Sequence, residues 1–230
     1  MLRFIFAFLL LAGCSAPTPP PTRLPPYRAP ATYSAPSVTS FGAPATTSFP
    51  IVKGIPHQAN TYRARLIREV HAHWGLAGPV AIFAAQLHQE SGWREDARSP
   101  VGAMGLAQFM PGTAAWIAQV YPKELGEGAS LDAGWALRAV VIYDRWIYKR
   151  VPGFQEADWN RWAAALSGYN GGLGWVQKDR ALAGGQCDTT LWWGCVERFS
   201  RRSPAAFKEN RGYPVRILRL YRPRYEVAGW

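Results

Sequence analysis

Apolar residues recur at intervals of three and four along most of the chain after residue 59, which is the pattern of amphipathic helices. Alternation of the kind seen in strands is scarce, and the sequence contains no internal repeat. We therefore expect a mainly α domain. The pattern predicts helices over residues 60–74, 79–91, 113–121, 130–151, 158–167, 173–183 and 213–221, the last broken by Pro223.

Residues known to begin and end helices bound several of these segments. Gly75 follows the first helix, where a residue without a Cβ suits the end of a helix. Pro79 suits the first position of the second helix, and Gly92 suits its end. Ser130 is predicted to cap the long helix that follows it.

The residues before this helical part have a different composition, dominated by Pro, Ala, Thr and Ser, with almost no periodic apolar pattern. Such a segment cannot bury enough apolar surface to fold, and its prolines favour an extended, semi-stiff chain. At about 3 Å per residue, about forty residues could reach on the order of 100 Å. We expect a tether over residues 14–56 and a folded domain over residues 57–230.

The first residues have the pattern of an export signal. A short basic start, Met1-Leu2-Arg3, precedes an apolar run that is too short to span a membrane. The run ends in Leu11-Ala12-Gly13-Cys14, which resembles the lipobox of bacterial lipoproteins. That resemblance implies that residues 1–13 are removed and that Cys14 is lipidated and anchored to the outer membrane on its periplasmic face. The alternative is an ordinary signal with an incidental cysteine.

Cysteine usage agrees with export. Once Cys14 is lipidated, Cys187 and Cys195 remain, and in an oxidising periplasm we expect them to form a disulfide around Trp192-Trp193-Gly194. The sequence has no Cys-x-x-Cys motif, and His71 and His73 are two positions apart on a predicted helix, so they point in different directions. We expect no metal and no cofactor.

Charge and aromatic content narrow the choice of partner. The formal net charge is +11 over 230 residues, and the chain contains 11 tryptophans, which stack well on rings. For an exported chain, an acidic wall polymer or an anionic membrane surface explains this charge better than nucleic acid does. A solvated basic face without a partner is the alternative. The C-terminal part is rich in basic residues: Arg198, Arg201, Arg202, Lys208, Arg211, Arg216, Arg219, Arg222 and Arg224.

The second predicted helix carries the strongest candidate for catalysis. Glu90 lies on the same face as its apolar residues, while Gln86 and Gln89 lie off that face. A buried carboxyl group has a raised pKa, and a proton donor of this kind is what the cleavage of a glycosidic bond requires. The alternative is that Glu90 only pairs with Arg94. The apolar residues in question are Val80, Phe83, Ala84 and Leu87.

Three polar motifs follow one another at helix ends and glycine-rich loops: Glu90-Ser91, Gly105-Leu106-Ala107-Gln108 and Gly168-Tyr169-Asn170. Together they resemble the lytic transglycosylases with a lysozyme-like domain, which carry Glu-Ser, Gly-Leu-Met-Gln and Ala-Tyr-Asn in this order. The flanking residues 99–104 and 111–113 are also similar, and the resemblance covers about residues 60–180. Ala107 replaces a methionine and Gly168 an alanine, which puts details of substrate binding in doubt more than the activity.

The resemblance implies a lysozyme-like domain that cleaves the β-1,4 bond between N-acetylmuramic acid and N-acetylglucosamine in peptidoglycan without hydrolysis. Glu90 would protonate the leaving oxygen and then act as the base that forms a 1,6-anhydro sugar. The other residues that the resemblance implicates are Ser91 and Gln108, to orient Glu90 or polar groups of the substrate; Tyr169 and Asn170, to hold Glu90 and the sugar; and Met104 and Phe109, to line the groove.

Other readings of the same motifs stay open. A hydrolytic muramidase on this fold would need a second carboxylate, for which Glu95 and Asp96 are the candidates, although both lie past the end of the helix. A catalytically idle wall-binding lipoprotein is a further alternative. Enzymes of this kind also serve secretion or conjugation machines, and the sequence does not name such a partner.

Overall fold

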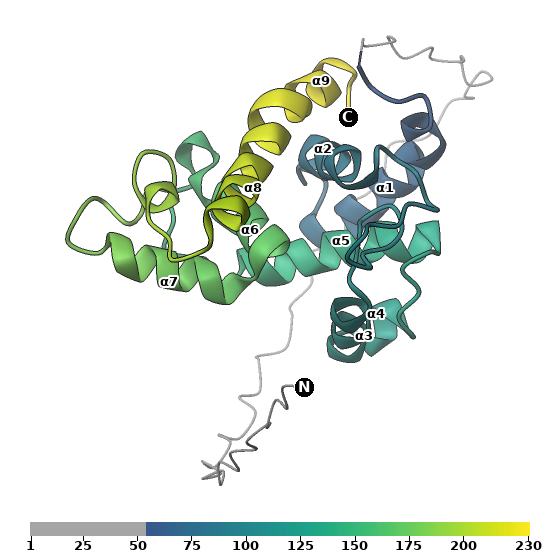
Figure 1. Ribbon diagram of the computed structural model, residues 1–230. Helices are drawn as coiled ribbons and strands as arrows, with labels where there is room; N and C mark the ends of the chain where they lie inside the picture. The colour runs from purple at the N-terminus through teal and green to yellow at the C-terminus, as the bar shows by residue number, and fades with distance from the viewer. Residues whose placement is uncertain (1–53) are drawn as a thin grey trace, which may run out of the picture. The chain divides into compact units, whose positions relative to one another are not determined.

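The computed structural model describes residues 54–230, which lie within one compact unit (Figure 1). Apart from isolated β-bridges, every regular element in this range is helical. The expected mainly α fold is thereby confirmed. Cys14, the signal segment and nearly all of the tether lie outside the described residues. The elements are α1 Ala59–Trp74, α2 Val80–Ser91, α3 Pro111–Val120, α4 Pro122–Leu125, α5 Ala133–Tyr148, η1 Ala157–Trp159, α6 Asn160–Gly171, α7 Leu173–Ala183, η2 Val196–Arg198, α8 Pro204–Val215, the π-helical η3 Arg216–Tyr221 and α9 Arg222–Val227.

Most of the predicted helices are present, with shifted ends. The helices predicted at 60–74, 79–91 and 173–183 correspond to α1, α2 and α7. The cap of α5 is Asp132 and not Ser130: the Asp132 carboxylate accepts a hydrogen bond from the Trp135 backbone N–H at 2.6 Å. Ser130 is buried instead. Both side chains suit an N-cap, so only the packing of the preceding loop decides between them.

The end of α6 and the C-terminal helices differ from the prediction. The helix expected to end at Ser167 continues to Gly171, so that Tyr169 and Asn170 lie on its last turn. The helix expected over 213–221 is the middle of a continuous helical run, α8–η3–α9. Pro223 does not break this run: it lies in the first two positions of α9, directly after the π-helical η3.

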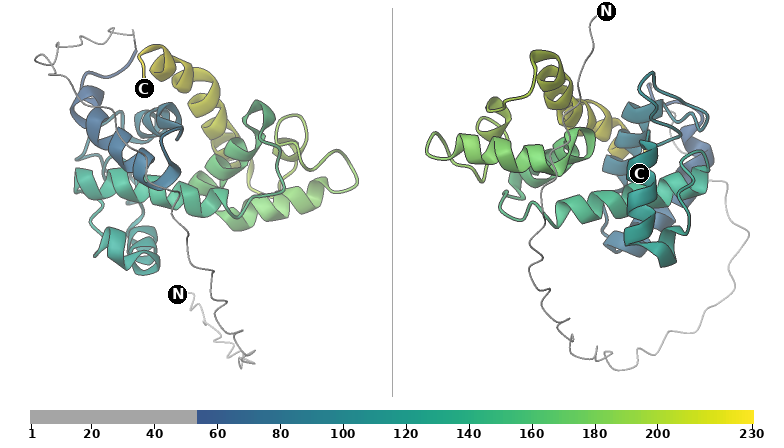
Figure 2. Two further views of the ribbon diagram at one scale, coloured as in Figure 1. Left: turned by 180° about the vertical axis from the view of Figure 1, so that it is seen from behind. Right: turned by 60° about the horizontal axis from the view of Figure 1, so that its bottom comes forward.

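Three sets of helix contacts organise the domain (Figures 1 and 2). Helix α5 packs against α1 and α6, and also against α3 and α4. Helix α8 packs on α6, while η3 and α9 pack on α2, so the C-terminal run joins α6 to α2. Because α2 is covered by α1, η3 and α9, its residues 80–87 are all buried. Gln86, which we expected off the buried face, is therefore fully buried.

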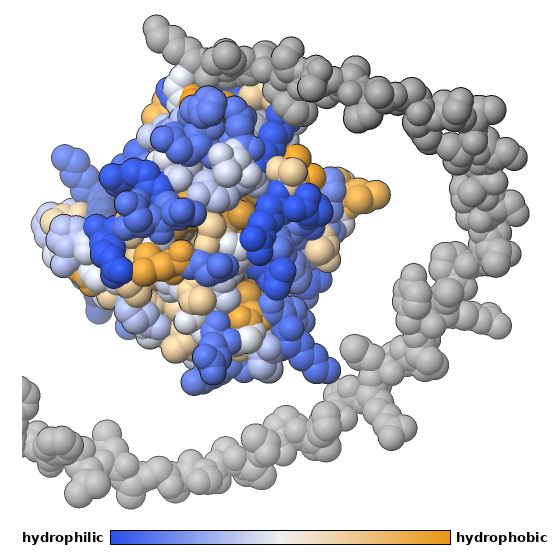
Figure 3. Space-filling view, turned by 90° about the vertical axis from the view of Figure 1, so that its right-hand side faces the viewer, coloured by the Kyte–Doolittle hydropathy of each residue, from blue (hydrophilic) through white to orange (hydrophobic). Residues whose placement is uncertain are grey.

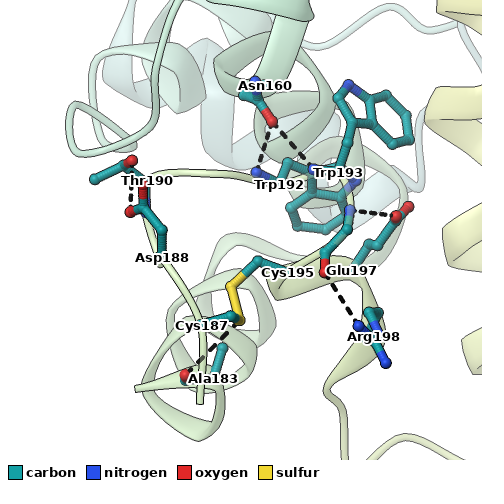
Figure 4. The surroundings of a disulfide bond; sticks show 11 residues. Asn160, Ala183, Cys187, Asp188, Thr190, Trp192, Trp193, Cys195, Glu197 and Arg198 are labelled. Carbon is teal, nitrogen blue, oxygen red and sulfur yellow. Dashed lines mark hydrogen bonds between the residues drawn. A yellow bond between two sulfur atoms is a disulfide. The ribbon is translucent and has the colours of Figure 1, made fainter. Parts of the chain in front are cut away.

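The predicted disulfide between Cys187 and Cys195 is present and closes the segment between α7 and η2 (Figure 4). Trp192 is buried inside this segment. The Asn160 side-chain oxygen, at the start of α6, accepts hydrogen bonds from the backbone N–H groups of Trp192 at 2.8 Å and Trp193 at 3.0 Å. The covalent bond and these hydrogen bonds hold the segment against α6 and α7.

One face of the described part is largely polar. Hydrophilic side chains cover most of the face drawn in Figure 3, where apolar side chains form small separate patches. Within residues 54–230, no helix is both long enough and apolar enough to cross a membrane.

Candidate active site

The loop between α2 and α3 is fastened at several points, and this fixes one wall of a pocket. The Ser91 hydroxyl donates to the Leu106 carbonyl at 2.8 Å, which ties the loop to the end of α2. The Gln108 amide donates to the carbonyls of Ala97 at 3.1 Å and Gly105 at 2.9 Å. These hydrogen bonds join separate parts of the loop to one another and to α2, and they restrict the movement of the residues after Gly105.

A pocket of about 390 Å³ lies between this loop, the end of α2 and the C-terminal run. Its wall combines carboxyl, amide and aromatic side chains from six helical elements and the loop, which suits a ligand with many hydroxyl and amide groups. The residues that line it are Gln89, Glu90, Ser99, Val101, Ala103, Gln108, Phe109, Met110, Thr113, Tyr143, Tyr169, Asn170, Glu209, Tyr213 and Arg216.

Glu90, on the last turn of α2, is the partly buried acid of this pocket. Burial is the main cause that raises the pKa of its carboxyl group, to about 8. A hydrogen bond from the Tyr213 hydroxyl to Oε1 and the nearby charge of Arg216 act in the opposite direction, while the charge of Glu209 raises the pKa. Glu90 is therefore mostly protonated at neutral pH and can donate a proton to a ligand in the pocket.

Aromatic rings pack beside Glu90 and connect α6 to the loop. The Tyr169 hydroxyl donates to the Ala107 carbonyl at 2.7 Å. Its ring lies parallel to that of Tyr213, with the centroids 6.3 Å apart, and meets the Phe109 ring edge-on at 5.8 Å. Asn170, the next residue, accepts a hydrogen bond from the Asn210 amide of α8 at 3.0 Å. The last turn of α6 is thus held between the loop and α8.

The structure brings most of the predicted site residues together in the pocket: Glu90, Gln108, Phe109, Tyr169 and Asn170 all line it. Ser91 and Met104 do not. The Ser91 hydroxyl donates to the Leu106 carbonyl, and the Met104 sulfur lies 3.1 Å from the exposed Arg98 guanidinium. It is Met110 that lines the pocket.

The two acids that the muramidase reading would use are not in the pocket. Glu95 is exposed and accepts a hydrogen bond from the Tyr62 hydroxyl at 2.8 Å. Asp96 is exposed as well, and neither residue lines the pocket. The only other carboxylate among its described lining residues is that of Glu209.

Sequence reasoning missed three residues that the C-terminal run contributes: Glu209, Tyr213 and Arg216. Tyr213 contacts Glu90 directly, and Arg216 donates to the Gln89 side chain at 2.8 Å. More than a hundred residues separate these partners along the chain. Their local sequence is basic and aromatic, and nothing in it indicates that it returns to the end of α2.

A second buried acid, Asp144 of α5, was also missed, although a signal for it existed. It lies three residues after Val141 and three before Ile147, on the buried stripe of the helix. Burial raises the pKa of Asp144 well above its usual value, the buried Gln86 lowers it, and the neighbouring Glu90 raises it. Burial of Asp144 therefore favours the protonated form of its carboxyl group.

One chemistry available to this pocket is proton transfer. In the described part of the chain, no three His, Cys, Asp or Glu side chains are grouped so that they could hold a metal ion. A protonated carboxyl group in an aromatic pocket can act as a general acid, and the carboxylate that remains can act as a base.

Comparisons with known proteins agree with this geometry. The family model described as the transglycosylase SLT domain matches residues 70–191. The soluble lytic murein transglycosylase of Salmonella typhimurium is 30% identical over 132 residues, which are 56% of this chain and 18% of that protein. The membrane-bound lytic murein transglycosylase F of Shewanella woodyi is 36% identical over 101 residues, 44% of this chain and 19% of that protein.

A solved structure shows the same fold. An inactive mutant of the lytic transglycosylase Slt from Pseudomonas aeruginosa superposes with a TM-score of 0.53 at 25% sequence identity, over 72% of this chain and 24% of that one. The expected lysozyme-like architecture is thereby confirmed. This chain spans only about a fifth of the length of the curated relatives that it matches. Because the family model covers more than half of the chain, the protein belongs to the transglycosylase SLT domain family.

Proposed function

We propose that this protein is a lytic transglycosylase that cleaves the β-1,4 bond between N-acetylmuramic acid and N-acetylglucosamine in peptidoglycan. The observation that carries the proposal is Glu90: a carboxyl group with its pKa raised to about 8, held by Tyr213 at the wall of an aromatic and amide-lined pocket. The relatives named as lytic murein transglycosylases support the choice of substrate.

The reaction that we propose has two proton transfers through one residue. Glu90 gives its proton to the glycosidic oxygen as the bond from that oxygen to C1 of the muramic sugar breaks. The substrate's acetamido group stabilises the positive charge at C1, so that no carboxylate nucleophile is needed. The Glu90 carboxylate then takes the proton of the muramic C6 hydroxyl while that oxygen bonds to C1. The products are a 1,6-anhydro sugar and a free 4-hydroxyl, and Glu90 is protonated again.

Tyr213 supports both steps in this scheme. Its hydroxyl donates to Oε1 of Glu90, which leaves Oε2 for the substrate. The same hydrogen bond stabilises the carboxylate that exists between the two transfers. Gln108 and Asn170 line the pocket and supply amide groups for the sugar substituents, and the rings of Phe109 and Tyr169 supply surfaces for the sugar rings.

Product analysis tests this proposal. The purified protein is incubated with sacculi, and the released muropeptides are identified by mass spectrometry. Anhydro products are about 18 Da lighter than the products of hydrolysis, because no water is added when the proton returns through the same residue. Products with a reducing end would show a muramidase instead, and intact sacculi would refute the activity.

The pH dependence tests the role of Glu90. Because the acid must be protonated, kcat/KM is expected to be constant below about pH 8 and to fall above it. In Tyr213→Phe the hydrogen bond that lowers the Glu90 pKa is lost, so the alkaline limb is expected to move to higher pH. In Glu209→Gln a negative charge that raises this pKa is lost, so the limb is expected to move to lower pH.

Opposite shifts in these two variants would not arise from general damage to the pocket. Tyr169 of α6, Asp144 and Tyr143 of α5, and Arg216 of η3 also lie near Glu90 and are unchanged in both variants. A limb that stays at the same pH in both would show that another group controls the rate.

We further propose that residues 1–13 are a signal peptide and that lipidated Cys14 anchors the chain to the outer membrane, so that the domain works in the periplasm. The lipobox-like Leu11-Ala12-Gly13-Cys14 supports this. The proposed tether over 14–56 would let the domain reach the wall, for example beside a secretion or conjugation machine. Metabolic labelling with a fatty-acid analogue tests the anchor, since the label should be absent from Cys14→Ala.

A further inference from the structure

Two buried polar side chains that the proposed reaction does not use lie next to one another in the core. Asp144 of α5 and Gln86 of α2 are both fully buried, and Gln86 is close enough to lower the pKa of the Asp144 carboxyl group. No partner at full hydrogen-bonding geometry is present among the described residues for Oδ1 and Oδ2 of Asp144 or for Oε1 and Nε2 of Gln86. Unpaired buried polar atoms are uncommon because each one costs stability, so four of them in one place call for an explanation.

These two side chains connect two walls of the Glu90 pocket. Gln86 lies four residues before Glu90 on α2, and residues at this spacing share one face of a helix. Asp144 follows Tyr143, which lines the pocket from α5. Helix α2 is covered by α1, η3 and α9, and the contact between Gln86 and Asp144 adds a link from α2 to α5. Hydrogen bonds between the two side chains would therefore fix the end of α2, which carries Glu90, relative to α5.

A neutral carboxylic acid and a primary amide can satisfy all four of these atoms at once. The acid O–H donates to the amide oxygen, and an amide N–H donates to the carbonyl oxygen of the acid. An ionised carboxylate only accepts, so it would leave Oε1 of Gln86 unpaired. The last torsion of each side chain is soft, so a small rotation brings the two groups into this arrangement. The set of unpaired atoms thus favours the protonated form of Asp144.

The charges around Asp144 favour the same form. The titratable groups that interact with it are Glu90 of α2, Tyr143 of its own helix, Tyr169 of α6 and Tyr213 of α8. None of these groups is a cation, and no cation from α1, α3 or α4, which also pack on α5, acts on the pKa of Asp144. A buried carboxylate without a positive partner is costly, so a group in this position keeps its proton.

We propose that Asp144 is a positioning residue for Glu90: as a neutral acid it exchanges two hydrogen bonds with the Gln86 amide, and this acid–amide pair holds the last turn of α2 in place against α5. The inference rests on the proposed function in that it takes Glu90 as the proton donor. Neither member of the pair lines the pocket, so the pair acts through Glu90 and not on the substrate. Because it is neutral, it adds no charge beside Glu90 during the reaction.

The pH dependence of stability tests the neutral acid without any measurement of activity. The unfolding equilibrium constants of the wild type and of Asp144→Asn are measured in urea between about pH 5 and pH 7. Above about pH 4 an unfolded aspartate releases its proton, whereas the proposed pair keeps it in the folded state, so the wild type loses stability as the pH rises. Asparagine does not titrate, and it can still exchange two hydrogen bonds with Gln86. The wild-type constant divided by the variant constant is expected to rise about tenfold per pH unit, and a constant ratio would overturn the proposal.

Kinetics test the positioning role. Asp144→Leu has a similar size but leaves the Gln86 amide buried without a partner, so Glu90 is expected to shift and kcat to fall about tenfold, with KM nearly unchanged. The exchange variant Gln86→Glu/Asp144→Asn puts the acid on α2 and the amide on α5 with the same side-chain lengths. It re-forms the pair and is expected to restore most of kcat. An exchange variant that is no more active than Asp144→Leu would contradict the role of the pair.

Val141→Ala is the control for general damage to the core. Val141 is fully buried on the same face of α5, three residues before Asp144, and does not line the pocket. Its truncation leaves a cavity and lowers stability but keeps the acid–amide pair, so kcat is expected to stay near the wild-type value. An equal fall of kcat in Val141→Ala and Asp144→Leu would refute a specific positioning role.

Asp144→Asn keeps the test decisive if Asp144→Leu does not fold. Because the proposed pair is neutral, the alkaline limb of kcat/KM in Asp144→Asn is expected to stay at the wild-type pH. If Asp144 were ionised, its replacement would remove a negative charge beside Glu90 and move the limb to lower pH, which would overturn the proposal. If the wild type cleaves no peptidoglycan, the proposed function fails, while the stability ratio still decides whether Asp144 is a neutral acid.

Discussion

Glu90→Gln is expected to lower the release of anhydro-muropeptides from sacculi by about a thousandfold, within the range that general acid catalysis contributes. Glutamine has nearly the shape of the protonated acid, and its side-chain oxygen can still accept the hydrogen bond from Tyr213. It cannot give a proton to the glycosidic oxygen or take one back. The rate of product release, measured by mass spectrometry, is the quantity to compare.

Thermal unfolding is the control for this variant, because the raised pKa has a predictable effect on stability. Between its ordinary pKa of 4.5 and about 8, Glu90 keeps a proton in the folded state that it releases on unfolding. Its contribution to the free energy of unfolding therefore falls as the pH rises through this range. Glutamine does not titrate, so at pH 8 the variant is expected to be at least as stable as the wild type.

An active variant would contradict the assignment. If Glu90→Gln keeps more than about a tenth of the wild-type rate, a group other than Glu90 supplies the proton. Glu209 would then be the acid to replace, because it is the other carboxylate among the described residues of the pocket wall.

Gly105→Ala is expected to destabilise the domain by about 3 kcal/mol or more. Gly105 has φ +76°, which an L-residue adopts only at a cost. A Cβ there would also lie 1.8 Å from the Ser130 carbonyl oxygen. The backbone of the loop or of the segment before α5 would have to move. Urea unfolding, followed by circular dichroism, measures the change.

Gly102→Ala is the matched control in the same loop. Gly102 has φ +92°, but a Cβ there would meet nothing within 4 Å. It is therefore expected to cost only about 1–2 kcal/mol, the conformational part of the penalty. Equal losses in the two variants would show that the contact with Ser130 does not determine the conformation of the loop. The activity of Gly105→Ala should also fall, because Gln108 and Phe109 follow directly.

Short-range patterns in the sequence determined much of this protein. The spacing of apolar residues and the glycines at 75 and 92 are enough to place α1 and α2 and to put Glu90 at the end of a buried helix. The resemblance carried by the three polar motifs implicated seven site residues, and five of these line the pocket: four from the motifs and Phe109 beside them. The same spacing of apolar residues in α5 also indicates that Asp144 is buried, because the face on which a helical residue lies depends only on its near neighbours in the sequence.

Other features depend on contacts between distant parts of the chain, which local patterns do not encode. Only the tertiary structure shows that α8–η3–α9 returns to α2 and places Tyr213 on Glu90. Only the packing of α2 on all sides explains why Gln86 is buried. The contact between Trp175 and Arg202 is of the same kind, because it exists only where α7 and the segment before α8 lie together. The sequence by itself determined the helices and the acid, whereas the fold decided the acid's partners, its raised pKa and the shape of the binding surface. Burial and long-range contacts exist only once the helices have packed.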